Sequence, residues 1–467
     1  MTTHDAGETC DILVTNGYVI TMDAARTVHP VGAVAVTGTR IVAVGPETAI
    51  AARFRPRRAI DAGGGVIHPG MIDAHLHATN HLTRTGFPDD PKINAFEKFA
   101  GWIDNLADED EFANSLVACT EMVRNGFTCL MEPGTVHEPD TLATAAEAVG
   151  ARVSLSDPYV WDTTEGGNPM APHIKRAPAN PKRARDLLGR ELRRNRVEDG
   201  LVHAHVCIYG SGSASQELEL EAKRVADANG VIFNQHQSFS PTQVAIDDRR
   251  FGGGPVLVRF AELGLLGPNS TFTHMNVIRD EEVEPIVASG MSITWQPGNY
   301  QYYGFAQTQK SRMAELLDRG VNVTLGVDVA KIWTFGDMPR IAYLVARQGG
   351  GYISCERLME MSTIGAARAL GLEREIGSLE PGKRADIVVR SPDPIETLPG
   401  FNPVVQLLML SQSRAVDTVL CNGQIILREG RLTRLDESWV HRTARACIAR
   451  MAGRLDLKVA TRWEAGA

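Results

Sequence analysis

The sequence predicts an α/β protein built on a TIM (β/α)8 barrel, with a small β-sandwich domain contributed by both ends of the chain. Short β-branched runs alternate with helical patterns through the middle of the sequence, and eight such runs can be counted. β-like runs with Asn-Gly turns occur near both ends. The 467 residues exceed the size at which one hydrophobic core stops growing, so a large domain with a smaller companion is expected.

The predicted barrel strands are separated by stretches with helical periodicity. The eight runs occupy residues 67–77, 128–133, 151–157, 201–209, 231–239, 270–277, 291–297 and 321–329. Helical patterns, for example over 217–229 and 280–289, lie between them. An open doubly wound sheet is the structural alternative, but its Gly-x-Gly-x-x-Gly turn is missing where a first strand would meet a helix. A closed barrel is therefore favoured.

Short β-like runs with turn signals occur near both ends of the chain. Runs within residues 11–61 are matched by runs at 385–389 and 418–426, so one β domain is expected from both ends. The basic tract at 53–58 contains a proline, which predicts a loop. The predicted parts are 1–68 and 376–435 for the β domain, 69–375 for the barrel, and 436–467 for a C-terminal helix and tail.

Composition limits the partners and the location of the chain. Hydrophobic residues make up 43% and charged residues 22%, which is typical of a packed globular protein. The net charge of -8 and a single short basic tract argue against nucleic acid as a partner. The start of the chain lacks signal-peptide features and no run of about 18 apolar residues occurs, so no membrane association and a cytoplasmic location are expected. The seven cysteines are spread singly, which predicts buried, reduced thiols.

Metal-competent side chains stand late in several predicted strands, where barrel enzymes place their active sites. His75 and His77 alternate along the first run, so both point to the same side and can hold one ion. His236, His274 and Asp328 stand late in three further runs. A single buried histidine at a strand end is usually structural, but several strand ends sharing that feature favour a metal centre.

Other histidines receive no catalytic role from their positions. His203 and His205 form a second His-x-His, but they lie several residues before the end of their run and are interpreted as structural. His81, His137 and His173 are expected in loops.

Four segments resemble one family. Residues 69–77 (PGMIDAHLH) resemble the barrel entry of amidohydrolases, within the branch of cytosine, guanine and adenosine-homocysteine deaminases and triazine hydrolases. Residues 320–328 (GVNVTLGVD) are similar to their eighth barrel strand. Residues 366–372 and 377–386 resemble their exit from the barrel. The resemblance spans roughly residues 10–435.

The resemblance implies a metal-dependent enzyme. The implied metal ligands are His75, His77, His236 and Asp328, with His274 either ligating the metal or holding its water. Family members with two metals bridge them through a carboxylated lysine on the fourth strand, and residues 201–213 contain no lysine. One divalent ion per subunit is therefore expected. Nitrogen and carboxylate ligands suit zinc best, with cobalt, iron or manganese as alternatives.

The resemblance also implies roles for two side chains in catalysis. The ion would lower the pKa of a bound water toward about 7, so that hydroxide attacks the substrate. Asp328 would accept the proton of that water and pass it to the leaving group. His274 would hydrogen-bond the attacking oxygen and the tetrahedral intermediate.

The sequence departs from this branch at two strand ends. Deaminases of the branch usually carry His-x-x-Glu on the fifth strand, whereas residues 236–239 read HQSF, so the acid is missing unless Glu132 or another carboxylate replaces it. At the seventh strand end, residues 295–299 (WQPGN) precede several aromatic residues, which favours an apolar or flat substrate. The predicted substrate contacts are Tyr209, Phe239, Trp295 and Asn299.

These departures favour a hydrolase that cleaves a C–N or C–S bond of an amide, carbamate, thiocarbamate or urea-like small molecule. Herbicide-hydrolysing members of the family such as molinate hydrolase are similar in size and style, which implies xenobiotic degradation. The first alternative is a deaminase or chlorohydrolase acting on an aminated N-heterocycle. The second is a catalytically inactive binding protein with the same barrel. Family members are commonly homo-oligomers, so the expected partners are a small-molecule substrate and further copies of the chain.

Overall fold

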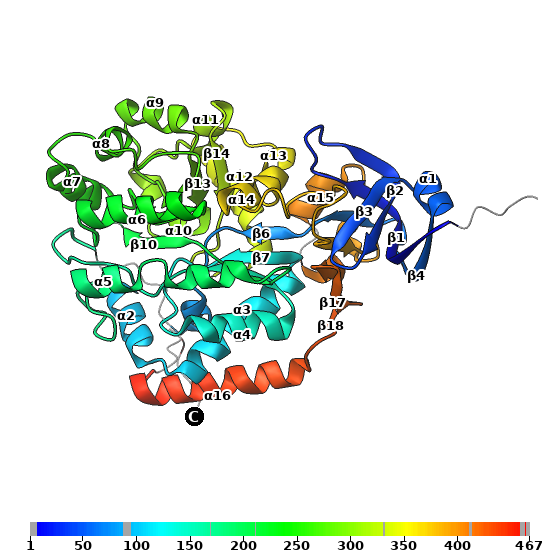
Figure 1. Cartoon of the computed structure of the whole chain (residues 1–467), viewed down its shortest axis with the longest axis horizontal. Helices are drawn as coiled ribbons and strands as arrows, with labels where there is room; N and C mark the ends of the chain where they lie inside the picture. The colour runs from blue at the N-terminus through cyan, green and yellow to red at the C-terminus, as the bar shows by residue number, and fades with distance from the viewer. Residues whose placement is uncertain are drawn as a thin grey trace, which may run out of the picture.

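The computed structural model describes residues 7–86, 95–168, 170–210, 212–329, 332–410, 413–457 and 463. Within the predicted tail, 458–462 and 464–467 lie outside the described residues, as do the first six residues of the predicted β domain. The chain forms a helix-covered barrel at the left of Figure 1 and a separate group of strands at the right. The fold is an α/β TIM barrel with a β-sandwich from both chain ends, as predicted.

Parallel strands form the barrel. They are β6 (Met71–Asp73), β7 (Phe127–Met131), β8 (Arg152–Leu155), β9 (Val202–Ala204) continued by β10 (Val206–Gly210), β11 (Phe233–Gln237), β12 (Ser270–His274), β13 (Ser292–Trp295) and β14 (Asn322–Leu325). Neighbours from β6 to β9 and from β10 to β14 pair in parallel. Each predicted run contains a barrel strand, because β-branched and apolar runs are buried on both faces of a parallel sheet.

The first and last barrel strands are joined at their C-terminal ends. Leu76 and Asp328 form a parallel bridge, and the backbone N–H of Asp328 donates to the carbonyl of His75 at 2.8 Å. The buried carboxylate of Asp73 accepts the N–H of His75 at 3.1 Å and that of Val327 at 2.9 Å. These bonds close the barrel where the predicted metal ligands stand.

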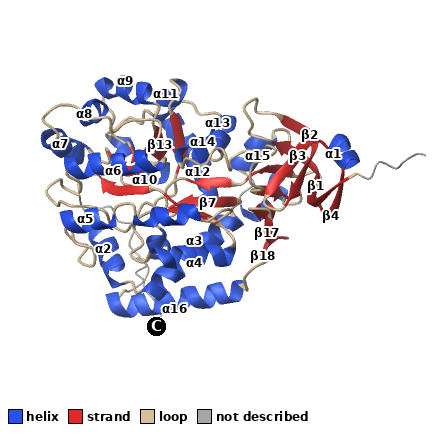
Figure 2. Cartoon of the chain, in the orientation of Figure 1, coloured by secondary structure: helices blue, strands red, loops and turns tan. Residues whose placement is uncertain are grey.

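Helices surround the barrel, as Figure 2 shows in blue. They are α2 (Ala95–Asn105), α3 (Asp108–Arg124), α4 (Pro139–Val149), α5 (Pro181–Leu187), α6 (Gln216–Asn229), α7 (Pro241–Arg250), α8 (Val256–Glu262), α9 (Asp280–Ser289), α10 (Pro297–Tyr302), α11 (Met313–Asp318), α12 (Met338–Gln348), α13 (Cys355–Met361) and α14 (Ile364–Ala369). Helix α6 shows how local sequence sets the ends of such a helix. Ser215 caps its first turn, and Gly230 ends it at a φ of 63°. Its buried Leu218, Ala222 and Ala226 recur every four residues and face the barrel core.

Short 3₁₀ turns occur in the connections. They are η1 (Ala78–Thr83), η2 (Arg190–Arg196), η3 (Phe305–Gln307), η4 (Phe335–Asp337), η5 (Ile395–Thr397) and η6 (Ser413–Ala415). Runs of this length are typical of connectors between longer elements. η1 directly follows His77 and contributes to the active face of the barrel.

A mixed sheet unites the two chain ends. Its strands are β1 (Glu8–Ile20), β2 (Val28–Thr37), β3 (Arg40–Pro46), β4 (Phe54–Asp61), β5 (Val66–Pro69), β15 (Ile387–Arg390), β16 (Val416–Cys421), β17 (Gln424–Arg428) and β18 (Arg431–Leu432). Strands β15 and β5 pair antiparallel, which joins the C-terminal and N-terminal halves. Figure 1 shows these blue and orange segments side by side. The short helices α1 (Glu47–Arg53) and α15 (Pro403–Met409) complete this part of the molecule.

The predicted run at 67–77 divides between the two parts. Residues 66–69 form β5 of the mixed sheet, and the barrel begins only at β6. Gly70 lies at the break, where an added Cβ would stand 2.1 Å from the Thr128 hydroxyl. The predicted boundary between residues 68 and 69 therefore falls inside β5. A continuous apolar run does not reveal that its backbone changes sheets, because both sheets bury it.

The predicted loop at the basic tract is wrong. Residues 54–61 form β4, which pairs in parallel with β1 alone. Pro56 is tolerated there because an edge strand does not need every backbone N–H. Two arginines of the tract, Arg53 and Arg57, form exposed ion pairs with Glu8 and Asp11.

The C-terminal helix α16 (Glu437–Leu455) packs along α2 and α3, and is the red helix of Figure 1. Its buried Cys447 and Met451 join Trp102 in a small apolar cluster. Arg450 pairs with the buried carboxylate of Asp110 at the start of α3. One face of the predicted surface helix is thus fixed to the barrel.

The described residues include no helix whose length and apolar content would let it cross a bilayer. All seven cysteines are buried and unpaired, as predicted. Burial raises the pKa of the Cys119 thiol to about 12, so this group is not a thiolate nucleophile at neutral pH.

A buried ion pair links the barrel to the mixed sheet and predicts a stability effect. Arg152 of β8 donates to Asp386, just before β15, at 3.1 and 3.3 Å, and both side chains are 2% exposed. Asp386→Asn should leave the guanidinium uncompensated and lower the free energy of unfolding by about 3–5 kcal/mol. Chemical denaturation monitored by circular dichroism measures this change.

The matched control is Asp186→Asn, which removes the acidic partner of an exposed pair with Lys182. It should leave the denaturation midpoint unchanged, because exposed pairs contribute little. Equal midpoints for the two variants would show that the buried pair does not hold the two parts together.

Candidate metal centre

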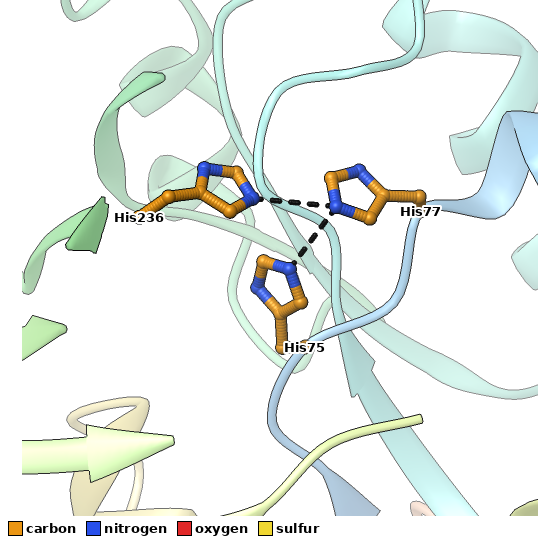
Figure 3. Close-up of side chains that lie close together, drawn as sticks. All are labelled: His75, His77 and His236. Atoms are coloured by element: carbon orange, nitrogen blue, oxygen red, sulfur yellow. Dashed lines mark hydrogen bonds between the residues drawn. The ribbon is translucent and has the colours of Figure 1, made fainter. Parts of the chain in front are cut away.

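Three imidazoles converge at the C-terminal end of the barrel. His75 and His77 follow β6, and His236 lies on β11. The Nε2 atoms of His75 and His77 are 3.2 Å apart, and those of His77 and His236 are 3.3 Å apart (Figure 3). All three residues are buried, and one ligand atom from each lies within 4.8 Å of the others. Unprotonated nitrogens repel one another at such distances, so the arrangement fits a shared divalent cation.

Asp328 borders the same centre from the end of β14. One of its carboxylate oxygens lies 3.1 Å from His77 Nε2, and the other lies 3.9 Å from His274 Nδ1. Burial acts to raise the pKa of Asp328, but the adjacent imidazoles of His77, His274 and His75 outweigh it and hold that pKa well below its usual range. Three nitrogens and an ionised carboxylate are a donor set that suits zinc.

Each converging imidazole is fixed through its other nitrogen. The Nδ1 atom of His236 lies 2.8 Å from the carbonyl of Tyr209. The Nδ1 of His77 lies 3.1 Å from the Thr135 hydroxyl, and that of His75 lies 3.3 Å from the Thr273 hydroxyl. Such partners select the tautomer that leaves Nε2 free to bind a metal.

The protonation states also suit metal binding. Burial lowers the pKa of His75 and of His236 well below the ordinary histidine value, and the neighbouring imidazoles lower both further. Both rings are therefore neutral at physiological pH, which is the form that ligates metals.

Glu132 supports His77 and is not free to act as the missing acid. Its carboxylate accepts the backbone N–H of Gly134 and of Thr135, each at 2.8 Å, and the Thr135 hydroxyl donates to it as well. The Thr135 oxygen is thereby left to accept the N–H of His77. Glu132 thus orients a candidate metal ligand through Thr135, and the structure does not favour it as the replacement for a strand-five acid.

The backbone is strained at two functional positions. His274 has a φ of 75° and Asp328 a φ of 61°, a region that non-glycine residues rarely adopt. Gln296 accepts the N–H of His274 at 3.0 Å, and Asn299 donates to the carboxylate of Asp328. Strain of this kind costs of order 1–3 kcal/mol and is typical of active sites. Asn299, predicted to contact substrate, therefore holds Asp328.

An aromatic-walled cavity opens beside the converging imidazoles. His77, His236, His274 and Asp328 contribute its polar lining, together with Asn80 and Thr135. Its aromatic lining consists of Phe96, Phe99, Tyr159, Tyr209, Phe239 and Tyr303. The ring of Phe239 lies 4.8 Å from that of His274 and 5.6 Å from that of Tyr303. The cavity thus suits a flat, uncharged ring.

Only two of the four predicted substrate contacts line the cavity. Tyr209 and Phe239 line the cavity. Trp295, on β13, is 1% exposed and packs in the barrel core, so we leave it out of the proposed site. Sequence reasoning missed Phe96, Phe99 and Tyr159, which lie on α2 and after β8, where no local pattern marks a residue as facing the barrel mouth.

The second His-x-His, His203 and His205, contacts other groups, in agreement with its structural interpretation. The Nδ1 of His205 lies 2.9 Å from the Ser154 hydroxyl, and His203 lies 3.2 Å from the guanidinium of Arg152. Burial lowers the pKa of His205 to about 3 and that of His203 to about 4. Neither residue lines the cavity described above.

The fold and the histidine cluster define a metal-dependent enzyme on a TIM barrel. The chain belongs to the amidohydrolase family, whose model matches residues 66–426.

Curated relatives share most of the length of the chain. A 5-methylthioadenosine/S-adenosylhomocysteine deaminase of Syntrophobacter fumaroxidans is 29% identical over 432 residues, which are 90% of this chain and 94% of the relative. A 5'-deoxyadenosine deaminase of Methanothermobacter thermautotrophicus is 28% identical over 404 residues, 84% of this chain and 89% of the relative.

Solved structures share the fold. An adenosine deaminase from Xanthomonas campestris with bound zinc has a TM-score of 0.84 and 23% identity, covering 96% of this chain and 100% of that one. An atrazine chlorohydrolase from Arthrobacter aurescens complexed with zinc has a TM-score of 0.82 and 21% identity, covering 94% of this chain and 100% of that one.

These comparisons correct the function predicted from the sequence. Cleavage of an amide, carbamate, thiocarbamate or urea-like molecule is wrong, because the matching relatives are deaminases of adenosine derivatives. The similarity to molinate hydrolase and the role in xenobiotic degradation are not supported either. The prediction gave too much weight to Phe239, a single residue of the cavity wall.

The hydrogen bond between Thr135 and His77 predicts an effect on metal affinity. Thr135→Val keeps the shape of the side chain but removes the oxygen that fixes the imidazole. The affinity for zinc should fall about 10–100-fold, as measured by competition with a chromogenic chelator.

Thr163→Val is the control, since Thr163 is not among the residues that line the cavity. It should leave the affinity for zinc unchanged. An unaltered affinity in Thr135→Val would mean that His77 needs no such support.

Proposed function

We propose that this chain is a hydrolytic deaminase that replaces the amino group of a purine nucleoside derivative with oxygen. The observation that carries the proposal is the convergence of His75, His77 and His236 beside an aromatic-walled cavity. A stacked heterocycle in this cavity would present its amino-bearing carbon to the centre. The names of the curated relatives support an adenosine derivative.

We assign the metal to His75, His77, His236 and Asp328, with one ion per subunit and zinc as the preferred metal. When bound, a divalent cation lowers the pKa of a coordinated water toward about 7 and so supplies the nucleophile. Cobalt, iron and manganese remain alternatives, because the same donor atoms accept them.

Asp328 would transfer protons, and His274 would hydrogen-bond the attacking oxygen. Asp328 is held by Asn299 and faces the centre, so its carboxylate is placed to take a proton from water and return it to the departing amine. His274 lies beside Asp328 and lines the cavity, where it would hydrogen-bond the attacking oxygen. Water adds to the ring carbon, ammonia leaves, and the ring retains the oxygen.

A product assay tests the proposal. The purified enzyme with added zinc should release ammonia from at least one of 5'-methylthioadenosine, S-adenosylhomocysteine and 5'-deoxyadenosine, and a chelator should abolish the release. Mass spectrometry should show the amino group exchanged for oxygen in an otherwise intact nucleoside. Cleavage of a substrate into two organic fragments, or no reaction with any adenosine derivative, would falsify it.

Asp328→Asn separates metal binding from proton transfer. The amide keeps an oxygen near the centre but cannot carry the proton, so we expect much of the metal to remain while kcat falls by about 10²–10⁴. Metal analysis and steady-state kinetics measure the two effects.

Asp393→Asn provides a matched exposed control, and it should match the parent enzyme in both measurements. Near-normal turnover in Asp328→Asn would remove Asp328 from the mechanism.

A further inference from the structure

Deamination of an aromatic ring needs a donor at the ring nitrogen. Water adds readily to an amino-bearing carbon only when the neighbouring ring nitrogen is hydrogen-bonded, because that nitrogen takes up the electron pair of the C=N bond. Among the described residues that line the cavity, Asp328 is the only carboxylate, and it faces His77 and Asn299. Phe239 offers no proton. The donor must come from another side chain of the wall.

The lining of the cavity includes several hydroxyl groups that can donate a hydrogen bond. The Thr135 hydroxyl is engaged between Glu132 and His77. Tyr159 is 1% exposed, and its ring lies 4.7 Å from that of His137 and 6.4 Å from that of Tyr209. Tyr303 lines the cavity from the connection after α10, where its ring stacks on that of Phe96 at 5.5 Å.

Tyr209 has the position that the chemistry requires. It lies on β10, and its ring stacks on that of His236 with 4.6 Å between centroids and 26° between planes. Trp161 supports the ring at 5.1 Å. The side chain is only partly buried and lines the cavity. A donor carried on a strand and packed between two rings is rigidly placed.

We propose that the hydroxyl of Tyr209 donates a hydrogen bond to the ring nitrogen next to the amino-bearing carbon of the substrate. This inference rests on the proposed deaminase function and assigns the group that activates the ring. It also defines the substrate class more closely, as a neutral heterocycle with an acceptor nitrogen beside its amino group. Charged rings and rings without that acceptor are excluded.

Ligand binding tests the hydrogen bond without relying on turnover. The probes are 5'-deoxyadenosine and its 1-deaza analogue, which lacks the acceptor nitrogen, titrated into zinc-loaded enzyme by calorimetry at low temperature. The parent enzyme should bind the analogue about 10-fold more weakly, as loss of one hydrogen bond implies. Tyr209→Phe should bind both probes with equal affinity.

Kinetics on the same variants test the catalytic role. Tyr209→Phe should lower kcat for 5'-deoxyadenosine about 100-fold with the zinc content unchanged. Adding Phe239→Glu to that variant should restore at least about 10-fold of the loss, because a carboxylic acid would then face the cavity from the segment that follows β11. Tyr352→Phe, at an exposed position, should match the parent enzyme throughout.

The outcomes distinguish a failure of the Tyr209 inference from a failure of the proposed deaminase function. If the parent enzyme releases ammonia but Tyr209→Phe keeps its discrimination and turnover, the inference is overturned and the deaminase stands. Loss of zinc from Tyr209→Phe would also overturn it, since the tyrosine would then act only through His236. If the parent enzyme neither binds the nucleoside nor releases ammonia, the proposed function fails and the inference falls with it.

Discussion

Closure of the barrel between β6 and β14 is the constraint on which the site depends. The carboxylate of Asp73 accepts backbone N–H groups from both strand ends, and Leu76 pairs directly with Asp328. His75 and His77 are carried by one of these ends and Asp328 by the other. Because the C-terminal ends of barrel strands meet at one face, closing the sheet brings residues from opposite ends of the barrel segment to one centre.

Around this closure, neighbouring strands fix each ligand atom. Oxygens from Tyr209, Thr135 and Thr273 hold the Nδ1 atoms of the three imidazoles, and each comes from a different element. The positive φ angles of His274 and Asp328 are sustained by the same packed surroundings. A preorganised set of Nε2 atoms binds metal without rearrangement, which is why outer partners matter nearly as much as the ligands.

The reaction assigned from the sequence and the one supported by the comparisons differ for a definable reason. A divalent cation held by these histidines would supply the nucleophile whatever the leaving group is, so membership of the amidohydrolase family does not fix the substrate. Phe239 stands where relatives carry an acid, and on the sequence alone this absence favours another reaction class. Tyrosines also line the cavity, and we propose that one of them, Tyr209, supplies the donor in place of that acid.

The sequence by itself determined the barrel, the shared β domain and the histidine cluster of His75, His77 and His236, with Asp328 as a further candidate ligand. Each of these follows from a local pattern: alternation places His75 and His77 on one side, and short buried runs mark the strands. Tertiary structure alone decided the split of the 67–77 run at Gly70, the edge strand at the basic tract, the hold of Thr135 on His77, and the aromatic wall that includes Phe96 and Tyr159. These features arise from contacts between segments far apart in the chain. Local periodicity cannot predict such contacts.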